Sequence, residues 1–185
     1  RTLTSTVSYI KEQCNQYERL NLASETKSMM RIIESVHQIN HALTENGTDA
    51  GAVTTEMLEQ WARDSYVTGV LLLDENGKVQ VQYGDPVDGL STEELSEHMT
   101  SDALQDAILF SEKTYAMRFH CEDGSYADLA ATGNADGSGM VVAYYHTTLE
   151  YTRAFHLSVD TLLVGYNLEQ DGTIVVSSGK EIIAS

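Results

Sequence analysis

The chain has 185 residues, of which 42% are hydrophobic and 21% are charged, and these values are ordinary for a soluble globular protein. Its 28 acidic residues outnumber the 11 basic ones, and the net charge of −17 argues against anionic partners such as nucleic acid or acidic membrane surfaces. No window approaches the roughly 18 consecutive apolar residues of a transmembrane helix, and no signal peptide is visible. Because the first residue is Arg1 rather than Met, we expect a fragment or a processed product.

Residues 2–45 carry apolar side chains at alternating steps of three and four, and Gly does not occur before Gly47. This spacing predicts one or two long helices with an apolar stripe. The stripe consists of Leu3, Val7, Ile10, Cys14 and Tyr17, followed by Met29, Ile33, Val36 and Leu43, with Asn40 on the same seam. Such a stripe can pack on the chain's own sheet, or it can pair with a second copy of the helix in a homodimer.

A second helix is predicted to begin after Thr54, in the style of a capping box, and to carry Trp61 into the core. The apolar run Val70 to Leu73 then meets the turn Asp74-Glu75-Asn76-Gly77, and residues 78–83 alternate between polar and apolar. Asn-Gly between two β-type runs is a strong hairpin signal, because both residues tolerate the positive φ of a tight turn. We therefore expect a buried strand paired with a half-solvated one.

A helical stretch is predicted from Ser91 to Leu109, and three β runs follow it at residues 114–121, 125–132 and 139–145. The turns between them contain Asp-Gly pairs, which favour hairpins. Residues 147–156 read as a short helix or connector. Strands that turn by hairpins, with helices outside them, indicate an antiparallel α+β fold.

The first hairpin pattern recurs 95 residues later in Leu168-Glu169-Gln170-Asp171-Gly172-Thr173-Ile174-Val175-Val176-Ser177-Ser178-Gly179. A repeat at domain-sized spacing suggests a duplicated module, although two short matches can also arise from convergent hairpin chemistry. We expect a first module over residues 1–155, and a connector with the first hairpin of a second, incomplete module over residues 156–185.

This order of elements resembles the extracellular Cache sensor, the PAS-like domain of bacterial transmembrane receptors, and the start of a second module is similar to the double-Cache family. The residues that carry the resemblance are Leu-Leu-Leu-Asp-Glu-Asn-Gly-Lys-Val, Met-Val-Val-Ala-Tyr-Tyr-His and the C-terminal repeat. The resemblance implies ligand sensing outside the cell or in the periplasm, with flanking transmembrane helices and an output domain outside this chain. That output domain would be a histidine kinase or a diguanylate cyclase.

Side-chain alternation divides each strand of the three-stranded segment into two faces. We expect one face to pack on the long helix and the other to form a small-molecule site. The predicted site residues are Arg118, His120, Tyr126, Asp128, Tyr144 and His146. Arg and Tyr side chains suit an anionic or zwitterionic ligand, and Arg118→Ala should then abolish binding while leaving the melting temperature nearly unchanged. The alternative is a polar outward face with surface pairs such as Arg118–Asp128.

Amino-acid-binding Cache domains resemble this pattern in having Arg-x-Trp on one strand, whereas this chain has Arg118-Phe119-His120. No catalytic motif occurs, so we expect no enzyme activity and no cofactor in this chain; a hydrolase triad of Ser, His and Asp that only the fold assembles is left open. His37 and His41 make only a weak metal motif, and Cys14 and Cys121 can form a disulfide or remain buried thiols. The competing function is an adhesion or assembly module without a small ligand.

Overall fold

The computed structural model describes residues 3–45, 52–84, 102–152, 176–178 and 181–184. The chain divides into two compact units. One consists of Lys27–Thr147, and the other combines Arg1–Thr26 with Thr148–Ser185. The boundary predicted between residues 155 and 156 lies outside the described residues, and it stays a prediction.

The N-terminal region is one continuous helix, α1 (Leu3–Glu45). In α2 (Thr55–Asp64) the Thr54 hydroxyl accepts a hydrogen bond from the Met57 amide at 3.4 Å, which confirms the predicted N-cap. The described part of the next helix is α4 (Asp102–Leu109). Within the described residues, no helix combines the length and apolar character needed to cross a membrane.

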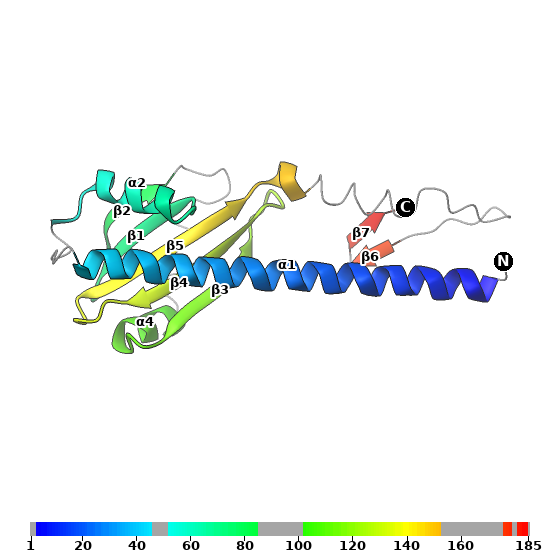
Figure 1. The fold of residues 1–185 in the computed structure, drawn as a ribbon, viewed down its shortest axis with the longest axis horizontal. Helices are drawn as coiled ribbons and strands as arrows, with labels where there is room; N and C mark the ends of the chain where they lie inside the picture. Colours follow the sequence, from blue (N-terminus) through cyan, green and yellow to red (C-terminus); the bar gives the residue numbers. More distant parts are fainter. Residues whose placement is uncertain (1–2, 46–51, 85–101, 153–175, 179–180, 185) are drawn as a thin grey trace. The chain divides into compact units, whose positions relative to one another are not determined.

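Five antiparallel strands form the sheet of the unit that contains Lys27–Thr147, in the order β2-β1-β5-β4-β3. The strands are β1 (Gly69–Asp74), β2 (Val79–Gly84), β3 (Thr114–His120), β4 (Tyr126–Gly133) and β5 (Gly139–Thr147). The N-terminal hairpin and the C-terminal three-stranded segment join where β1 pairs with β5 (Figure 1). The α+β class predicted from the sequence is confirmed.

The turn between β1 and β2 forms as predicted. Gly77 has a φ of 77°, and the Asp74 carboxylate accepts hydrogen bonds from the amides of Asn76 and Lys78, both at 2.9 Å. Five of the six residues of β1 are buried, because helices or strands cover this central strand on all sides. In β2 partly buried and exposed residues alternate, as expected for an edge strand with one packed face.

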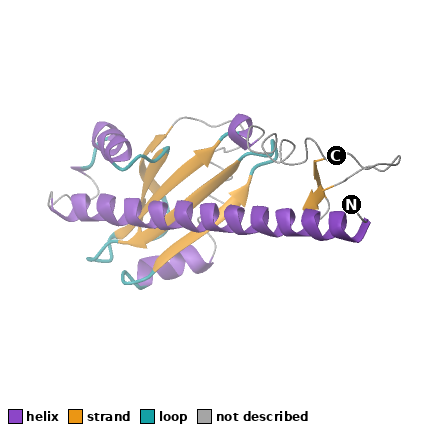
Figure 2. Ribbon diagram, turned by 45° about the vertical axis from the view of Figure 1, so that its right-hand side comes forward, coloured by secondary structure: helices purple, strands orange, loops and turns teal. Residues whose placement is uncertain are grey.

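Two hydrophobic clusters cover the two faces of this sheet. On one face α1 and α2 supply Ile32, Val36, Ile39, Leu43, Leu58 and Ala62, and these pack on Val70, Leu72, Ala130, Val141 and Ala143. On the other face Ala107 and Ile108 of α4 pack on Leu71, Leu73, Phe119, Leu129 and Met140, among others. Figures 1 and 2 show the helices on the two sides of the strands. The C-terminal part of α1 is therefore a core helix of this unit.

The buried side of α1 coincides only in part with the predicted stripe. Ile32 and Ile39 are 1% exposed, whereas the predicted Ile33 and Asn40 are only partly buried. Val36 and Leu43 are buried as predicted. The pattern Ile32, Val36, Ile39, Leu43 keeps the same steps of four and three, so periodicity alone did not distinguish the two registers.

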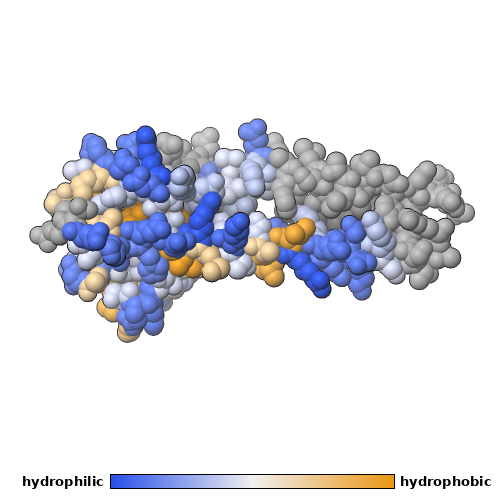
Figure 3. All heavy atoms as spheres, in the orientation of Figure 1, coloured by the Kyte–Doolittle hydropathy of each residue, from blue (hydrophilic) through white to orange (hydrophobic). Residues whose placement is uncertain are grey.

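The other unit contains the N-terminal part of α1, a helical segment at residues 149–152, and the strands β6 (Val176–Ser178) and β7 (Glu181–Ala184). These strands pair antiparallel in a separate two-stranded sheet. The predicted turn at Asp171-Gly172 lies outside the described residues. On α1, Leu20 and Leu22 are 68% and 65% exposed, and Figure 3 shows hydrophobic surface on this helix among mostly hydrophilic side chains.

Candidate functional site

A buried ion pair lies on the sheet face that packs against α1. Arg118 of β3 and Asp128 of β4 are partners in the strand register. Arg118 Nε donates to Asp128 Oδ1 at 2.6 Å, and Arg118 Nη2 donates to Oδ2 at 2.9 Å. The side chain of Asp128 is fully buried and that of Arg118 is 14% exposed. This bidentate pair is largely covered, and its carboxylate has no access to bulk water.

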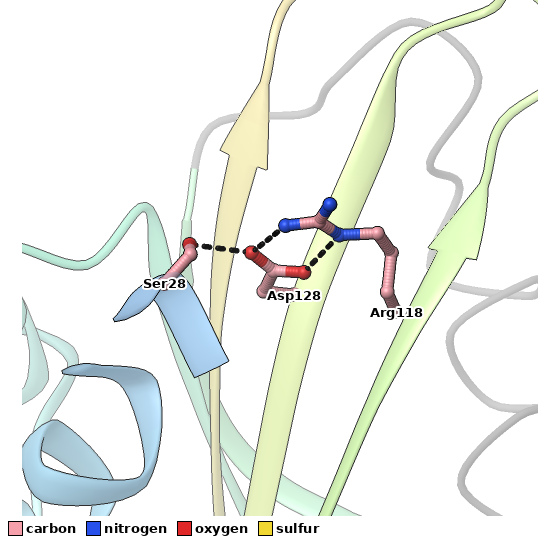
Figure 4. A network of polar contacts seen from close by, with 3 residues as sticks. All are labelled: Ser28, Arg118 and Asp128. Atoms are coloured by element: carbon pink, nitrogen blue, oxygen red, sulfur yellow. Dashed lines mark hydrogen bonds and ion pairs between the residues drawn. The ribbon is translucent and has the colours of Figure 1, made fainter. Parts of the chain in front are cut away.

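The same carboxylate connects the sheet to the long helix. Ser28 of α1 donates its hydroxyl hydrogen to Asp128 Oδ2 at 2.6 Å, so three elements meet at one carboxylate (Figure 4). Asp128 therefore accepts three hydrogen bonds, two from Arg118 and one from Ser28. We call Ser28, Arg118 and Asp128 the carboxylate network.

This network changes the expectation for Arg118→Ala. On an open sheet face the substitution would leave the melting temperature nearly unchanged. Here it would leave Asp128 as an uncompensated buried charge, which is strongly destabilising. The open polar face considered from the sequence is also wrong for this pair, because both side chains are largely covered.

Two more predicted site residues adjoin the network. The Arg118 guanidinium lies 4.1 Å from the ring centroid of Tyr126, a cation–π contact. The rings of Tyr126 and His120 are 6.1 Å apart, tilted by 59°. Four of the six predicted site residues thus share one face of the sheet. They form a chain of neighbours in the order Asp128, Arg118, Tyr126 and His120. Whether they bind a ligand stays a prediction.

Tyr144 and His146 lie on the opposite face, which corrects the predicted grouping. Tyr144 pairs in register with Leu129 and His146 with Ala127, and both partners belong to the α4 side of the core. The Tyr144 ring is buried against Gly69, where an added Cβ would approach it to 2.2 Å. The sequence also predicted that the site residues lie on the face away from the long helix. That prediction is wrong, because the face with Arg118 is the one that packs on α1.

His146 belongs to a small polar cluster where β4 begins and β5 ends. Its Nε2 lies 2.9 Å from the Ser125 hydroxyl, which donates to Asp123 at 2.6 Å. Burial lowers the pKa of His146, and the nearby Asp123 carboxylate opposes part of that shift. In a hydrolase triad the carboxylate orients the histidine, whereas here it binds the serine, which is itself fully buried. This cluster therefore closes a turn and offers no accessible nucleophile.

The structure also shows an open hollow of about 790 Å³ that sequence reasoning missed. It lies between α1, the α2–β1 connection and β5, next to the carboxylate network, because Tyr145 on its wall pairs in register with Asp128. The sequence placed Tyr145 on the face opposite Tyr144, and that alternation is correct. Tyr66, at the hollow, has a φ of 54°, which no local sequence signal indicated.

The structure holds no arrangement of three or more His, Cys, Asp or Glu side chains suited to a metal ion among the residues it describes. His37 lies 2.8 Å from the Thr114 hydroxyl, and His41 lies 3.5 Å from Glu45, so the two histidines have separate neighbours. Cys14 and Cys121 are free thiols, the first partly buried and the second buried.

No known protein-family model matches this chain, and no curated protein matches it either.

Proposed function

We propose that this chain is the ligand-sensing part of a Cache-type receptor, and that α1 transmits the binding event. Three features support the proposal. The element order is a long helix, a hairpin, a helix and a three-stranded segment, as the resemblance implies. The hairpin and the three strands form one sheet. The helix is bonded to that sheet through a buried carboxylate.

The observation that carries the proposal is the hydrogen bond from Ser28 to Asp128. Removing a donor from a buried carboxylate destabilises the folded state, because no water molecule can replace the lost hydrogen bond. The position of α1 on the sheet is thus coupled to the number of donors around Asp128. A ligand that supplies a donor beside the network, or that changes the position of Arg118, alters the relative free energies of two positions of the helix.

The network also limits the chemistry of the ligand. Asp128 already neutralises Arg118, so the guanidinium has less attraction for an anionic ligand than the sequence suggested. The proposal accordingly covers a small molecule without fixing the sign of its charge. The resemblance also implies that the receptor's sensing part lies outside the cell or in the periplasm, and that the receptor has flanking transmembrane helices and an output domain. These features belong to the proposal.

The test is a ligand screen with a readout of helix position. Amino acids, short carboxylates, purines and amines are screened for thermal stabilisation of the chain, since a ligand that binds only the native state raises the melting temperature. Spin labels at the exposed positions His41 and Gln82, in a background lacking Cys14 and Cys121, then report the distance between α1 and β2.

Sensing predicts that a stabilising compound changes the distance distribution, and that Ser28→Ala changes it without any compound. A chain that no compound stabilises, or a ligand that leaves the distance unchanged in both proteins, contradicts the proposal. The adhesion or assembly alternative predicts that no compound stabilises the chain.

A further inference from the structure

The open hollow beside the carboxylate network has the dimensions of a small-molecule site. Its volume of about 790 Å³ falls in the range of 300–1,000 Å³ that is usual for such sites. Its walls come from three separate elements of one unit. α1 supplies Arg31 and Glu34, the end of α2 and the α2–β1 connection supply Asp64 and Tyr66, and β5 supplies Tyr145. A ligand there would touch the helix and the sheet at once.

One wall of the hollow already binds a cation. The guanidinium of Arg31 lies 4.3 Å from the centroid of the Tyr145 ring. Arg31 is exposed, so its side chain can leave the ring and become hydrated at small cost. The Tyr145 ring is therefore a cation-binding surface whose present occupant is replaceable.

The charges around the ring favour a positive ligand. Glu34 and Asp64 give the hollow two carboxylates against the single cation of Arg31. The chain as a whole carries a net charge of −17, which raises the local concentration of small cations.

Two neutral polar groups on the wall are used within the protein. The Ser35 hydroxyl donates to the Ser65 carbonyl at 3.0 Å, and the Thr68 hydroxyl accepts from the His146 amide at 2.9 Å. These bonds hold the α2–β1 connection against α1 and β5, so the wall is preformed. Recognition then depends on the charged and aromatic side chains.

We propose that this hollow binds a small organic cation, an amine or a quaternary ammonium compound. The cation takes the place of the Arg31 guanidinium on the Tyr145 ring, and Glu34 and Asp64 balance its charge. Tyr66, a second aromatic residue, also lines the hollow. The inference rests on the proposed sensing function in that it names the ligand class and the place where the ligand meets α1.

The experiment is a titration of the whole chain with tetramethylammonium chloride, followed by NMR of the backbone amides. Sodium chloride holds the ionic strength constant, and sodium acetate is the anionic comparison. We expect shifts at residues 65–68 with tetramethylammonium and none with acetate. Arg31→Ala should tighten binding several-fold, because it removes both a competitor for the ring and a like charge. Glu34→Gln and Asp64→Asn should each weaken binding several-fold.

Matched variants separate local from global charge effects. Arg19→Ala and Glu12→Gln make the same changes of net charge at exposed positions of α1, and both should leave the affinity unchanged. The inference is overturned if tetramethylammonium shifts no amide at residues 65–68, if Arg31→Ala weakens binding, or if Glu12→Gln has the effect of Glu34→Gln. Folding of each variant is verified by the dispersion of its remaining amide signals.

Failure of this inference and failure of the proposed function have different signatures. If the compound screen finds a ligand of another class that moves α1, sensing stands and the organic-cation site is wrong. If tetramethylammonium binds at residues 65–68 but α1 stays in place, the cation site stands and transmission through the helix is wrong.

Discussion

The hydroxyl of Ser28 donates a 2.6 Å hydrogen bond to the carboxylate of Asp128, which lies one hundred residues further along the chain. Asp128 is fully buried and also binds Arg118 with both oxygens. A helix is thereby held to a sheet by a charged group that has no access to water. The contact is both a source of stability and a point at which movement of the helix changes the energy of the sheet.

Ser28→Ala should lower the free energy of unfolding by about 2 kcal/mol, the usual contribution of a hydrogen bond to a charged group. Ser24→Ala is the matched control on the same helix, where the serine is exposed and alanine is the better helix former. Urea denaturation measures both. Equal stability of the two variants would show that the Ser28 hydroxyl contributes nothing to the network.

Arg118→Ala should cost about 3–5 kcal/mol, because Asp128 is left as a buried charge without its main partner. Arg63→Ala removes an exposed arginine that pairs with Glu59 one helical turn away, and its melting temperature should hardly change. The double variant Arg118→Met with Asp128→Leu should recover most of the lost stability. If Arg118→Ala is more stable than the double variant, a buried charge is not the cause of the loss.

Stability should fall as the pH is lowered below the ordinary pKa of histidine, 6.5, because of His146. Burial lowers the pKa of His146 in the folded chain below its ordinary value of 6.5. The unfolded chain therefore takes up the proton first, and acid favours unfolding until the pH passes below the folded pKa. His146→Gln should flatten this part of the stability profile, whereas His41→Gln, at an exposed position, should preserve it. The test is chemical denaturation at a series of pH values.

Hydrogen bonds from the Ser125 hydroxyl and amide lower the pKa of Asp123. Its stabilising contribution is present above its ordinary value of 3.8 and is lost as the pH falls further through the folded pKa. The two groups therefore act in separate pH ranges. An unchanged slope just below pH 6.5 in His146→Gln would show that another group causes the loss.

Tyr66→Gly should raise the free energy of unfolding by about 1 kcal/mol, because glycine adopts positive φ without strain. The ring is 78% exposed, so little packing is lost. Tyr66→Ala is the control, since it removes the same ring but keeps a Cβ and thus the strain. If both variants are stabilised equally, the cause is the loss of the ring rather than relief of the backbone. Thermal denaturation distinguishes the two.

A homodimer through the N-terminal helix remains a prediction. Of the expected seam, Ile10, Cys14 and Tyr17 are partly buried in the chain. Ile10→Asp should convert a dimer to monomers, because it places a charge on the apolar stripe. Leu20→Asp makes the same change of charge at an exposed position off that stripe, and it should preserve the dimer. Sedimentation equilibrium gives the masses. Dissociation by Leu20→Asp instead would assign the interface to another face of the helix.

The sequence by itself determined which segments form helices and strands. Steps of three and four without Gly or Pro produced α1, Thr54 capped α2, and the Asn76-Gly77 pair closed the first hairpin. These signals are local, because they depend on hydrogen bonds and torsion angles within a few residues. Side-chain alternation within each strand was equally local and equally correct, including the separation of Tyr144 from Tyr145.

Only the tertiary structure decided which side chains of neighbouring strands lie on the same face of the sheet. Asp128 stands opposite both Arg118 and Tyr145, and that register moved Tyr144 and His146 to the far side of the sheet. The side-chain period of a strand is two, so a slip of one residue exchanges every face, and nothing local to a strand sets it relative to its neighbours. The burial of Asp128 and its bond to Ser28 depend on the packing of segments one hundred residues apart, which no local pattern encodes.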